Sequence, residues 1–325
     1  MKKPIALLAA SLALAACGRQ EAAGSSLDAG GAPTTLAPTG GKLEDLVFAV
    51  VGDTRPANPD DNAGYPTEVI TKIYQDLEAL SPRPAFVVAT GDYQYTSNNG
   101  NAAIQIGDYA SAMKLFSGPI FPAMGNHECN GYTKSNCGQG NVDGLTTNLT
   151  EFERQMLGPI GQSQPYYSIP FQAADGSWTA KIVVVAANAW DDAQASWLDQ
   201  ALSPETSYTF VVRHEPSSAT TAPGVGPSDA ILAKHPYTLL LVGHSHEYDH
   251  PAAGGSGSYC NCDYRELIVG NGGAPMSSYN GSTYGFAIVT RASDGTLSVQ
   301  QYDYSSNAPS GIQFSVTPAG QQTAG

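Results

Sequence analysis

Apolar runs alternate with amphipathic segments through most of this chain of 325 residues. Residues 46–53 and 85–92 are continuously apolar until a terminal Gly-Asp, a pattern typical of strands that are buried on both faces. Between them, residues 67–80 place apolar side chains on one helical stripe, and Pro82 and Pro84 end the predicted helix. This alternation predicts a layered α/β domain.

The same pattern continues toward the C-terminus. We expect further helices at residues 104–116, 151–157 and 193–202, and further strands at residues 120–128, 180–188, 208–215 and 237–247. Near the end of the chain, Asp294-Gly295 lies between two alternating runs and indicates an antiparallel hairpin. The second half of the domain is therefore expected to contain antiparallel strand pairs.

The N-terminal segment has a different pattern. Two lysines precede an apolar stretch at residues 5–16, which has the form of an export signal and is too short to span a bilayer. It ends in Leu-Ala-Ala-Cys, which resembles a bacterial lipobox and implies cleavage before Cys17 and acylation of that cysteine. An exported lipoprotein is then expected, anchored to the cell membrane or outer membrane with its domain in the periplasm or outside. An ordinary signal peptide that ends near a cysteine is the alternative.

Composition sets the remaining boundaries. Residues 18–42 are rich in small residues and proline without an apolar period, so we expect a flexible tether there. We place the globular domain at residues 43–305 and a C-terminal tail at residues 306–325. The formal net charge of −14 argues against a nucleic-acid coat. The oligomeric state has no signal in the sequence.

Four cysteines would remain after Cys17 is lipidated, and an even number in an exported chain favours disulfides. A bridge between Cys129 and Cys137 would close a short polar loop, whereas a bridge between Cys260 and Cys262 would be strained. The pairing stays open. A thiolate metal site is the rival interpretation, although Cys-Asn-Cys lacks the usual two-residue spacing.

Polar side chains gather at the ends of the predicted strands, where functional groups of open α/β sheets collect. Four of the six histidines of the chain lie in these positions, which argues against chance. The residues in question are Asp53, Asp92, Asn126, His127, His214, His244 and His246.

The order of these motifs, with GNHE at residues 125–128 and GHSH at residues 243–246, resembles the calcineurin-like metallophosphoesterases. The resemblance covers about residues 43–303. It implies a four-layer α/β/β/α sandwich of two mixed sheets, with two metal ions at the strand ends. It also implies hydrolysis of a phosphate ester, in which a metal-bridging hydroxide attacks phosphorus.

The resemblance implies a ligand set as well. Carboxylate, amide oxygen and imidazole suit zinc, manganese or iron. One metal would take Asp53 and His246, the other would take Asn126, His214 and His244, and Asp92 would bridge both. His127 would face the substrate phosphate and would stabilise transition-state charge or protonate the leaving oxygen.

Arg55 departs from the common superfamily pattern, which begins Asp-x-His with the histidine as a metal ligand. In this chain Asp53 is followed by Thr54 and then by Arg55 in place of that histidine. A guanidinium cannot coordinate a metal. The purple acid phosphatase branch, which the chain resembles most, has Gly-Asp-x-x-Tyr as its second motif, and Tyr95 fits this motif. The resemblance implies that Tyr95 is the missing ligand and favours iron at the first site, with iron, zinc or manganese at the second. Arg55 could then bind the substrate phosphate in a fork or make a structural ion pair.

Two alternatives stay open. One is a phosphodiesterase or nucleotidase that uses two divalent metals, with Tyr95 only packed nearby. The other is a non-catalytic surface lipoprotein that kept the fold, with Arg55 filling a vacated metal site.

Overall fold

The computed structural model describes residues 36–97, 100–129, 136–138, 146–250, 265–277 and 283–323. The expected signal segment, Cys17 and most of the tether lie outside the described residues, as do Cys260 and Cys262. Within these ranges, each helix is too short or too polar to cross a membrane.

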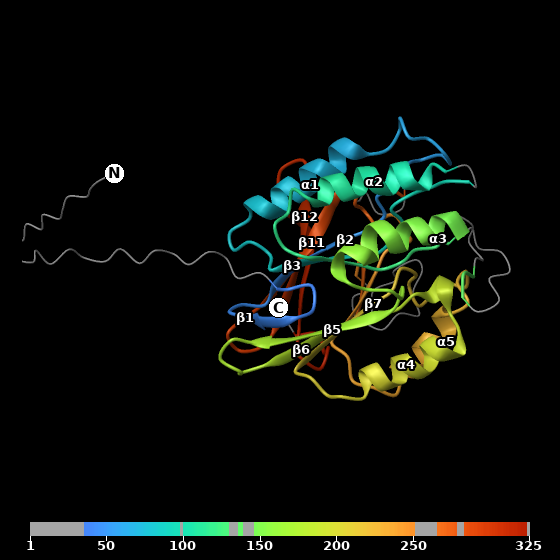
Figure 1. Ribbon diagram of the computed structural model, residues 1–325. Coiled ribbons are helices and arrows are strands. Elements are labelled where there is room, and N and C mark those ends of the chain that lie inside the picture. Colours follow the sequence, from blue (N-terminus) through green and yellow to red (C-terminus); the bar gives the residue numbers. More distant parts are fainter. Residues whose placement is uncertain are drawn as a thin grey trace, which may run out of the picture. The chain divides into compact units, whose positions relative to one another are not determined.

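The described strands form two mixed sheets that face each other (Figure 1). The seven-stranded sheet contains, in spatial order, β1 (Gly41–Leu43), β5 (Tyr167–Ala173), β6 (Thr179–Val184), β7 (Tyr208–Val212), β8 (Leu239–Val242), β10 (Glu266–Val269) and β9 (Tyr248–Asp249). The six-stranded sheet contains β13 (Ala308–Val316), β12 (Leu297–Asp303), β11 (Gly285–Arg291), β2 (Val47–Val51), β3 (Phe86–Ala89) and β4 (Ile120–Pro122).

Helices cover the outer face of each sheet, which completes the expected four-layer α/β/β/α sandwich (Figure 1). Over the six-stranded sheet lie α1 (Thr67–Ala79) and α2 (Ala102–Met113), and over the seven-stranded sheet lie α4 (Asp192–Leu202) and α5 (Val225–Leu232). The remaining helical segments are α3 (Thr146–Phe152), the π-helical turn η1 (Glu153–Leu157) and the 3₁₀ turns η2 (Gly158–Ile160) and η3 (Ala187–Ala189).

The apolar runs are explained by burial on both faces of the central strands. In β7, Phe210 and Val212 belong to the main core, where the Phe210 ring lies 4.8 Å from that of Phe48 in the opposite sheet. Val211 points the other way and packs in a second cluster with Leu198 of α4. A strand with two covered faces has no polar position, so its sequence shows no alternation.

Four strands were not expected from the sequence: β1, β5, β9 and β13. β13 lies within the expected C-terminal tail and pairs antiparallel with β12, so the sheet continues past residue 305. β1 lies in the expected tether and pairs with β5, which was also not predicted. Leu36, also within the expected tether, is buried against the domain. β1 and β13 lie at the edges of their sheets, and β5 is buried only at alternate positions. Pairing with a neighbouring strand, rather than a continuous apolar run, makes these segments strands.

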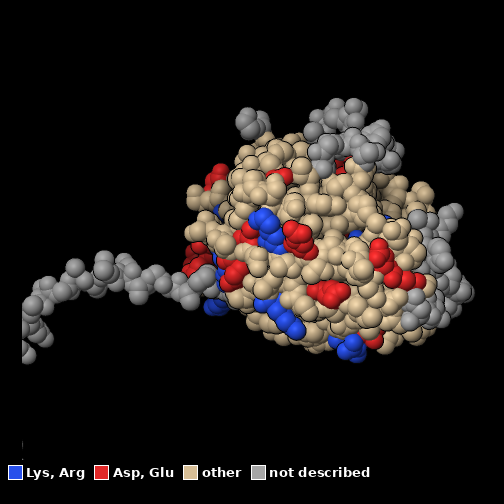
Figure 2. Space-filling view, turned by 90° about the horizontal axis from the view of Figure 1, so that it is seen from above, with Lys and Arg blue, Asp and Glu red and all other residues tan. Residues whose placement is uncertain are grey.

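Strand direction determines where the strand-end motifs meet. β2, β3 and β4 are parallel to one another, and so are β6, β7, β8 and β10. Their carboxyl ends therefore lie at one edge of each sheet. On the face seen in Figure 2, acidic and basic side chains are interspersed rather than gathered in one basic patch.

Candidate metal centre

Seven of the predicted site residues lie in the turns that follow strands β2, β3 and β4 of one sheet and β7 and β8 of the other. Asp53 follows β2, Asp92 follows β3, Asn126 and His127 follow β4, His214 follows β7, and His244 and His246 follow β8. Two hydrogen bonds join the turns of opposite sheets: His214 Nδ1 donates to the Thr90 carbonyl at 2.8 Å, and the His244 amide donates to Asp53 Oδ2 at 2.8 Å. The structure therefore brings the predicted residues of both sheets together.

Four of these residues have a left-handed backbone, which is rare for residues other than glycine. Their φ angles are 56° at Asp53, 59° at Asp92, 73° at His244 and 53° at His246. Such a conformation costs ~1–3 kcal/mol per residue and is usually found at functional sites. The sharp turn at each position directs the side chain inward from the strand end.

Glu128 holds one of these turns in place. Its carboxylate accepts hydrogen bonds from the amides of Asp92, Tyr93 and Gly125, each at 2.8 Å. Burial and the neighbouring Asp92 carboxylate raise the pKa of Glu128 to about 7. The last residue of the GNHE motif thus orients the Asp92 turn, a role that we did not assign from the sequence.

We call Asn126, His214 and His244 the histidine half of the centre. His244 Nδ1 lies 3.2 Å from Asn126 Oδ1 and 3.3 Å from His214 Nε2, and His214 Nε2 lies 3.2 Å from Asp92 Oδ1. Because His214 Nδ1 donates to Thr90, the lone pair of a neutral ring lies on Nε2, toward the other donors. These atoms are of the types that bind zinc, manganese or iron, and their spacing fits one shared ion.

We call Asp53, Arg55 and His246 the arginine half. Asp53 Oδ1 lies 3.5 Å from His246 Nε2, and His246 Nδ1 donates to the Pro275 carbonyl at 2.8 Å. Asp53 is fully buried, and its Oδ1 has no hydrogen-bond partner among the described residues. Burial raises the pKa of Asp53 to about 8 in the absence of a neutralising ion. A metal cation would give this carboxylate the partner that it lacks.

Arg55 lies against His246 and against the shared Asp92. Its Nη2 is 3.2 Å from His246 Nε2, and its Nε is 3.5 Å from Asp92 Oδ2. The guanidinium also lies 4.8 Å from the centre of the Tyr95 ring. The Tyr95 ring is thus in contact with a cation, and its role as a metal ligand stays a prediction.

A cavity of about 310 Å³ opens onto these groups and is lined by Arg55, Asp92, Tyr95, Asn126, His127, His244 and His246. The His127 amide donates to Asp92 Oδ1 at 3.1 Å, and its Nε2 is 3.7 Å from Asp92 Oδ2. Burial lowers the pKa of His127 to about 3, so its ring is neutral at pH 7. The cavity therefore offers His127 and Arg55 as donors to a small anionic group.

Glu215 and Asn188 also reach the centre, although the sequence did not single them out as site residues. Glu215 is fully buried and accepts a hydrogen bond from Asn188 Nδ2, while its Oε2 has no partner among the described residues. Donor atoms of His214, Glu215 and His244 lie within 4.8 Å of one another. Asn188 ends the predicted strand at residues 180–188, so the strand-end rule that found the other ligands could have found it.

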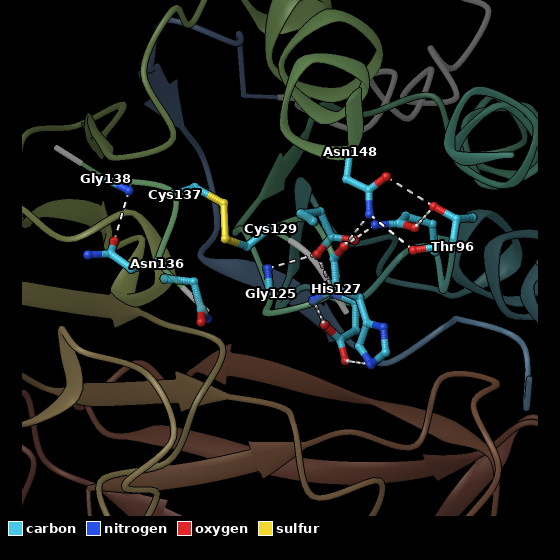
Figure 3. Close-up of a disulfide and its surroundings, with 12 residues drawn as sticks. Thr96, Gly125, His127, Cys129, Asn136, Cys137, Gly138 and Asn148 are labelled. Atoms are coloured by element: carbon cyan, nitrogen blue, oxygen red, sulfur yellow. Dashed lines mark hydrogen bonds and ion pairs between the residues drawn. A yellow bond between two sulfur atoms is a disulfide. The ribbon is translucent and has the colours of Figure 1, made fainter. Parts of the chain in front are cut away.

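A disulfide joins Cys129 and Cys137, whose Cα atoms are 5.6 Å apart (Figure 3). Cys129 directly follows the GNHE motif, and its amide donates to the Asn126 carbonyl at 3.1 Å. The Cys137 amide donates to the Asn188 carbonyl. The bridge therefore connects the turn that carries Asn126 with the turn that carries Asn188.

A family model described as Metallophos, calcineurin-like phosphoesterase, matches residues 46–248. No curated protein matches the sequence. The structure is similar to the purple acid phosphatase from yellow lupin (Lupinus luteus) seeds, with a TM-score of 0.60, 15% identity, and coverage of 87% of this chain and 55% of the lupin chain. It is also similar to GAP50, the anchor in the inner membrane complex of Plasmodium, with a TM-score of 0.50 and 13% identity. This match covers 81% of this chain and 86% of the GAP50 chain. This chain thus spans about half of the lupin protein, and at these identities the likeness concerns the fold.

Proposed function

Because the chain belongs to the calcineurin-like phosphoesterase family, a family of hydrolases, we propose that it hydrolyses phosphate monoesters with metal ions bound at the centre described above. The observation that carries this proposal is the convergence of donors from both sheets on one cavity, next to a buried carboxylate oxygen of Asp53 that has no partner in the part of the chain that the structure describes. The fold likeness to a purple acid phosphatase supports a monoester over other phosphate substrates.

The donor set fits metal ions in each half. Asn126, His214 and His244 would hold one ion, Asp53 and His246 would hold another, and Asp92, whose two oxygens point toward different halves, would contact both. The bound metals would supply a Lewis acid that activates water and neutralises phosphate oxygens.

The protein side chains would bind and orient the substrate. Arg55 presents a guanidinium to the cavity, which suits a phosphate oxygen pair better than a lysine ammonium would. His127 lines the same cavity, and its ring packs edge to face against Tyr95 with centroids 4.4 Å apart. We assign His127 the stabilisation of charge on the phosphoryl oxygens, since a neutral imidazole donates a hydrogen bond without adding a buried charge.

The proposal is tested by assaying the purified full chain on an aryl phosphate monoester and an aryl phosphate diester, before and after chelation of metals. We expect monoester hydrolysis that is lost on chelation and returns with added zinc, manganese or iron. Hydrolysis that survives chelation would exclude the metal-dependent mechanism, and faster cleavage of the diester would favour the phosphodiesterase alternative.

A second candidate function is a surface protein that retains the fold without catalysis. The contact of Arg55 with a donor atom of His246 favours it, because a cation there opposes a metal ion. The fold likeness to GAP50, named as an anchor, is consistent with it. A chain that binds metal but turns over neither aryl phosphate would support this candidate.

For localisation, we propose export and lipid anchoring through Cys17, which rests on the Leu-Ala-Ala-Cys pattern. Cys17→Ser is expected to move the protein from the membrane fraction to the soluble fraction. Wild-type protein that is already soluble, or that keeps residues 1–16 by mass spectrometry, would contradict the proposal.

A further inference from the structure

We infer that the two halves of the centre bind cations with unequal strength: the histidine half binds the first ion tightly, and Arg55 keeps the arginine half weak. The inference rests on the proposed function, since it concerns the metal ions that the phosphoesterase reaction would use. It concerns affinity and the order of loading, whereas the proposed function concerns the reaction.

Arg55 competes with a metal ion for the same atoms. His246 Nδ1 donates to Pro275, so the Nε2 lone pair is the one available to a metal, and the Arg55 Nη2 lies 3.2 Å from this atom. The guanidinium also faces Asp92 Oδ2 at 3.5 Å. An ion in the arginine half would have to displace these contacts and would then lie next to a permanent positive charge.

The guanidinium is held where it lies. Its Nη1 donates to the Pro56 carbonyl at 3.0 Å, and its plane lies over the Tyr95 ring. The Arg55 side chain is only 15% exposed, so little water screens its charge from the donors. Moving it aside would cost a cation–π contact and a hydrogen bond.

Arg55 does not replace a metal completely. It has no hydrogen bond with Asp53, whose buried Oδ1 keeps no partner among the described residues. This orphaned oxygen means that an ion can still gain a strong ligand in the arginine half. We therefore infer weak binding there rather than none.

The histidine half has a different charge environment, because the Arg55 contacts given above are with His246 and Asp92. Its own donors, Asn126, His214 and His244, include no carboxylate, but Glu215 is fully buried beside them with one oxygen unpartnered. A buried carboxylate without a cation is unfavourable, and an ion at this half would relieve it. Asp92 is shared, and each half has one further buried carboxylate, Asp53 in the arginine half and Glu215 beside the histidine half. Arg55 is therefore the charge that distinguishes the two halves.

The test is a zinc titration of the metal-free full chain, with bound zinc counted by elemental analysis after equilibrium dialysis. We expect one ion per chain to bind at least tenfold more tightly than the second. Arg55→Met should bring the two affinities within about threefold, and Arg55→Lys, which keeps the charge, should keep the second ion weak. Arg154→Met, at an exposed arginine remote from the donors, is the matched control and should change neither affinity.

Glu215→Gln tests the other half, since it removes the charge and keeps the shape. It should weaken the first ion at least tenfold, whereas Glu266→Gln, a change at another buried carboxylate, should not. Thermal unfolding of each metal-free variant checks that it is folded. Two equally tight ions in the wild type, or no change in Arg55→Met, would overturn the inference while leaving the hydrolysis proposal intact. A chain that binds no zinc would overturn both.

Discussion

The two halves of the centre share Asp92 and are built from the same kind of strand-end turn, yet they differ in charge. In the histidine half, the amide and imidazole donors lie 3.2–3.3 Å from His244 Nδ1, and a buried carboxylate lies beside them. In the arginine half, a guanidinium touches the donor atom of His246. The difference comes from Arg55, two residues after Asp53, whose charge enters one half although both halves contain left-handed strand-end turns.

The largest effect is expected from the residue that the halves share. Asp92→Asn should reduce hydrolysis to background and release the ions of both halves, because the amide offers only one neutral oxygen where two charged ones faced the donors. Hydrolysis rate and metal content measure this. Asp108→Asn, on the outer helix α2, is the control and should change neither the hydrolysis rate nor the metal content. If Asp92→Asn kept both ions, Asp92 would not be a ligand that the two halves share.

His127 belongs to neither half and separates catalysis from metal binding. His127→Ala should lower kcat by roughly 10²-fold, as expected for loss of one preorganised donor, while metal content stays the same. Steady-state kinetics and elemental analysis together give the result. Loss of metal along with activity would mean that His127 acts through the ligands rather than on the substrate.

Arg55→His should remove the difference between the halves. The change takes away the cation and supplies an imidazole at the position where the family resemblance implies a ligand histidine, so the second ion should bind about tenfold more tightly. Dialysis against limiting zinc measures the gain. A histidine that leaves the second ion weak would show that something other than the guanidinium charge limits the arginine half.

Tyr95→Phe should have the smallest effect and should be confined to the arginine half. If Tyr95 ligates iron through its phenolate, the iron-loaded wild type absorbs visible light and the variant does not. The ion of the histidine half should stay bound in both proteins. An absorption spectrum decides this, because an unchanged spectrum would leave Tyr95 as a packing residue beneath Arg55.

Local pattern predicted most of the central fold. The runs that became β2, β3, β7 and β8 are apolar because both of their faces are covered, and a sequence shows this directly. β13 could not be found this way, since most of its residues are partly exposed and its place comes from pairing with β12. Glu215 and Asn188 were missed for a related reason: the proximity of Glu215 to His244, and the hydrogen bond from Asn188 to Glu215, arise from the packing of separate strand ends.

The sequence by itself determined the chemical types at the centre and their order along the chain, because each lies directly after a strand that local pattern reveals. It also showed that Arg55 occupies a position where a ligand histidine is usual. Only the tertiary structure decided which groups Arg55 contacts there. His246 lies 191 residues further along the chain, and the distance between the two side chains depends on how two sheets pack, which no local pattern encodes.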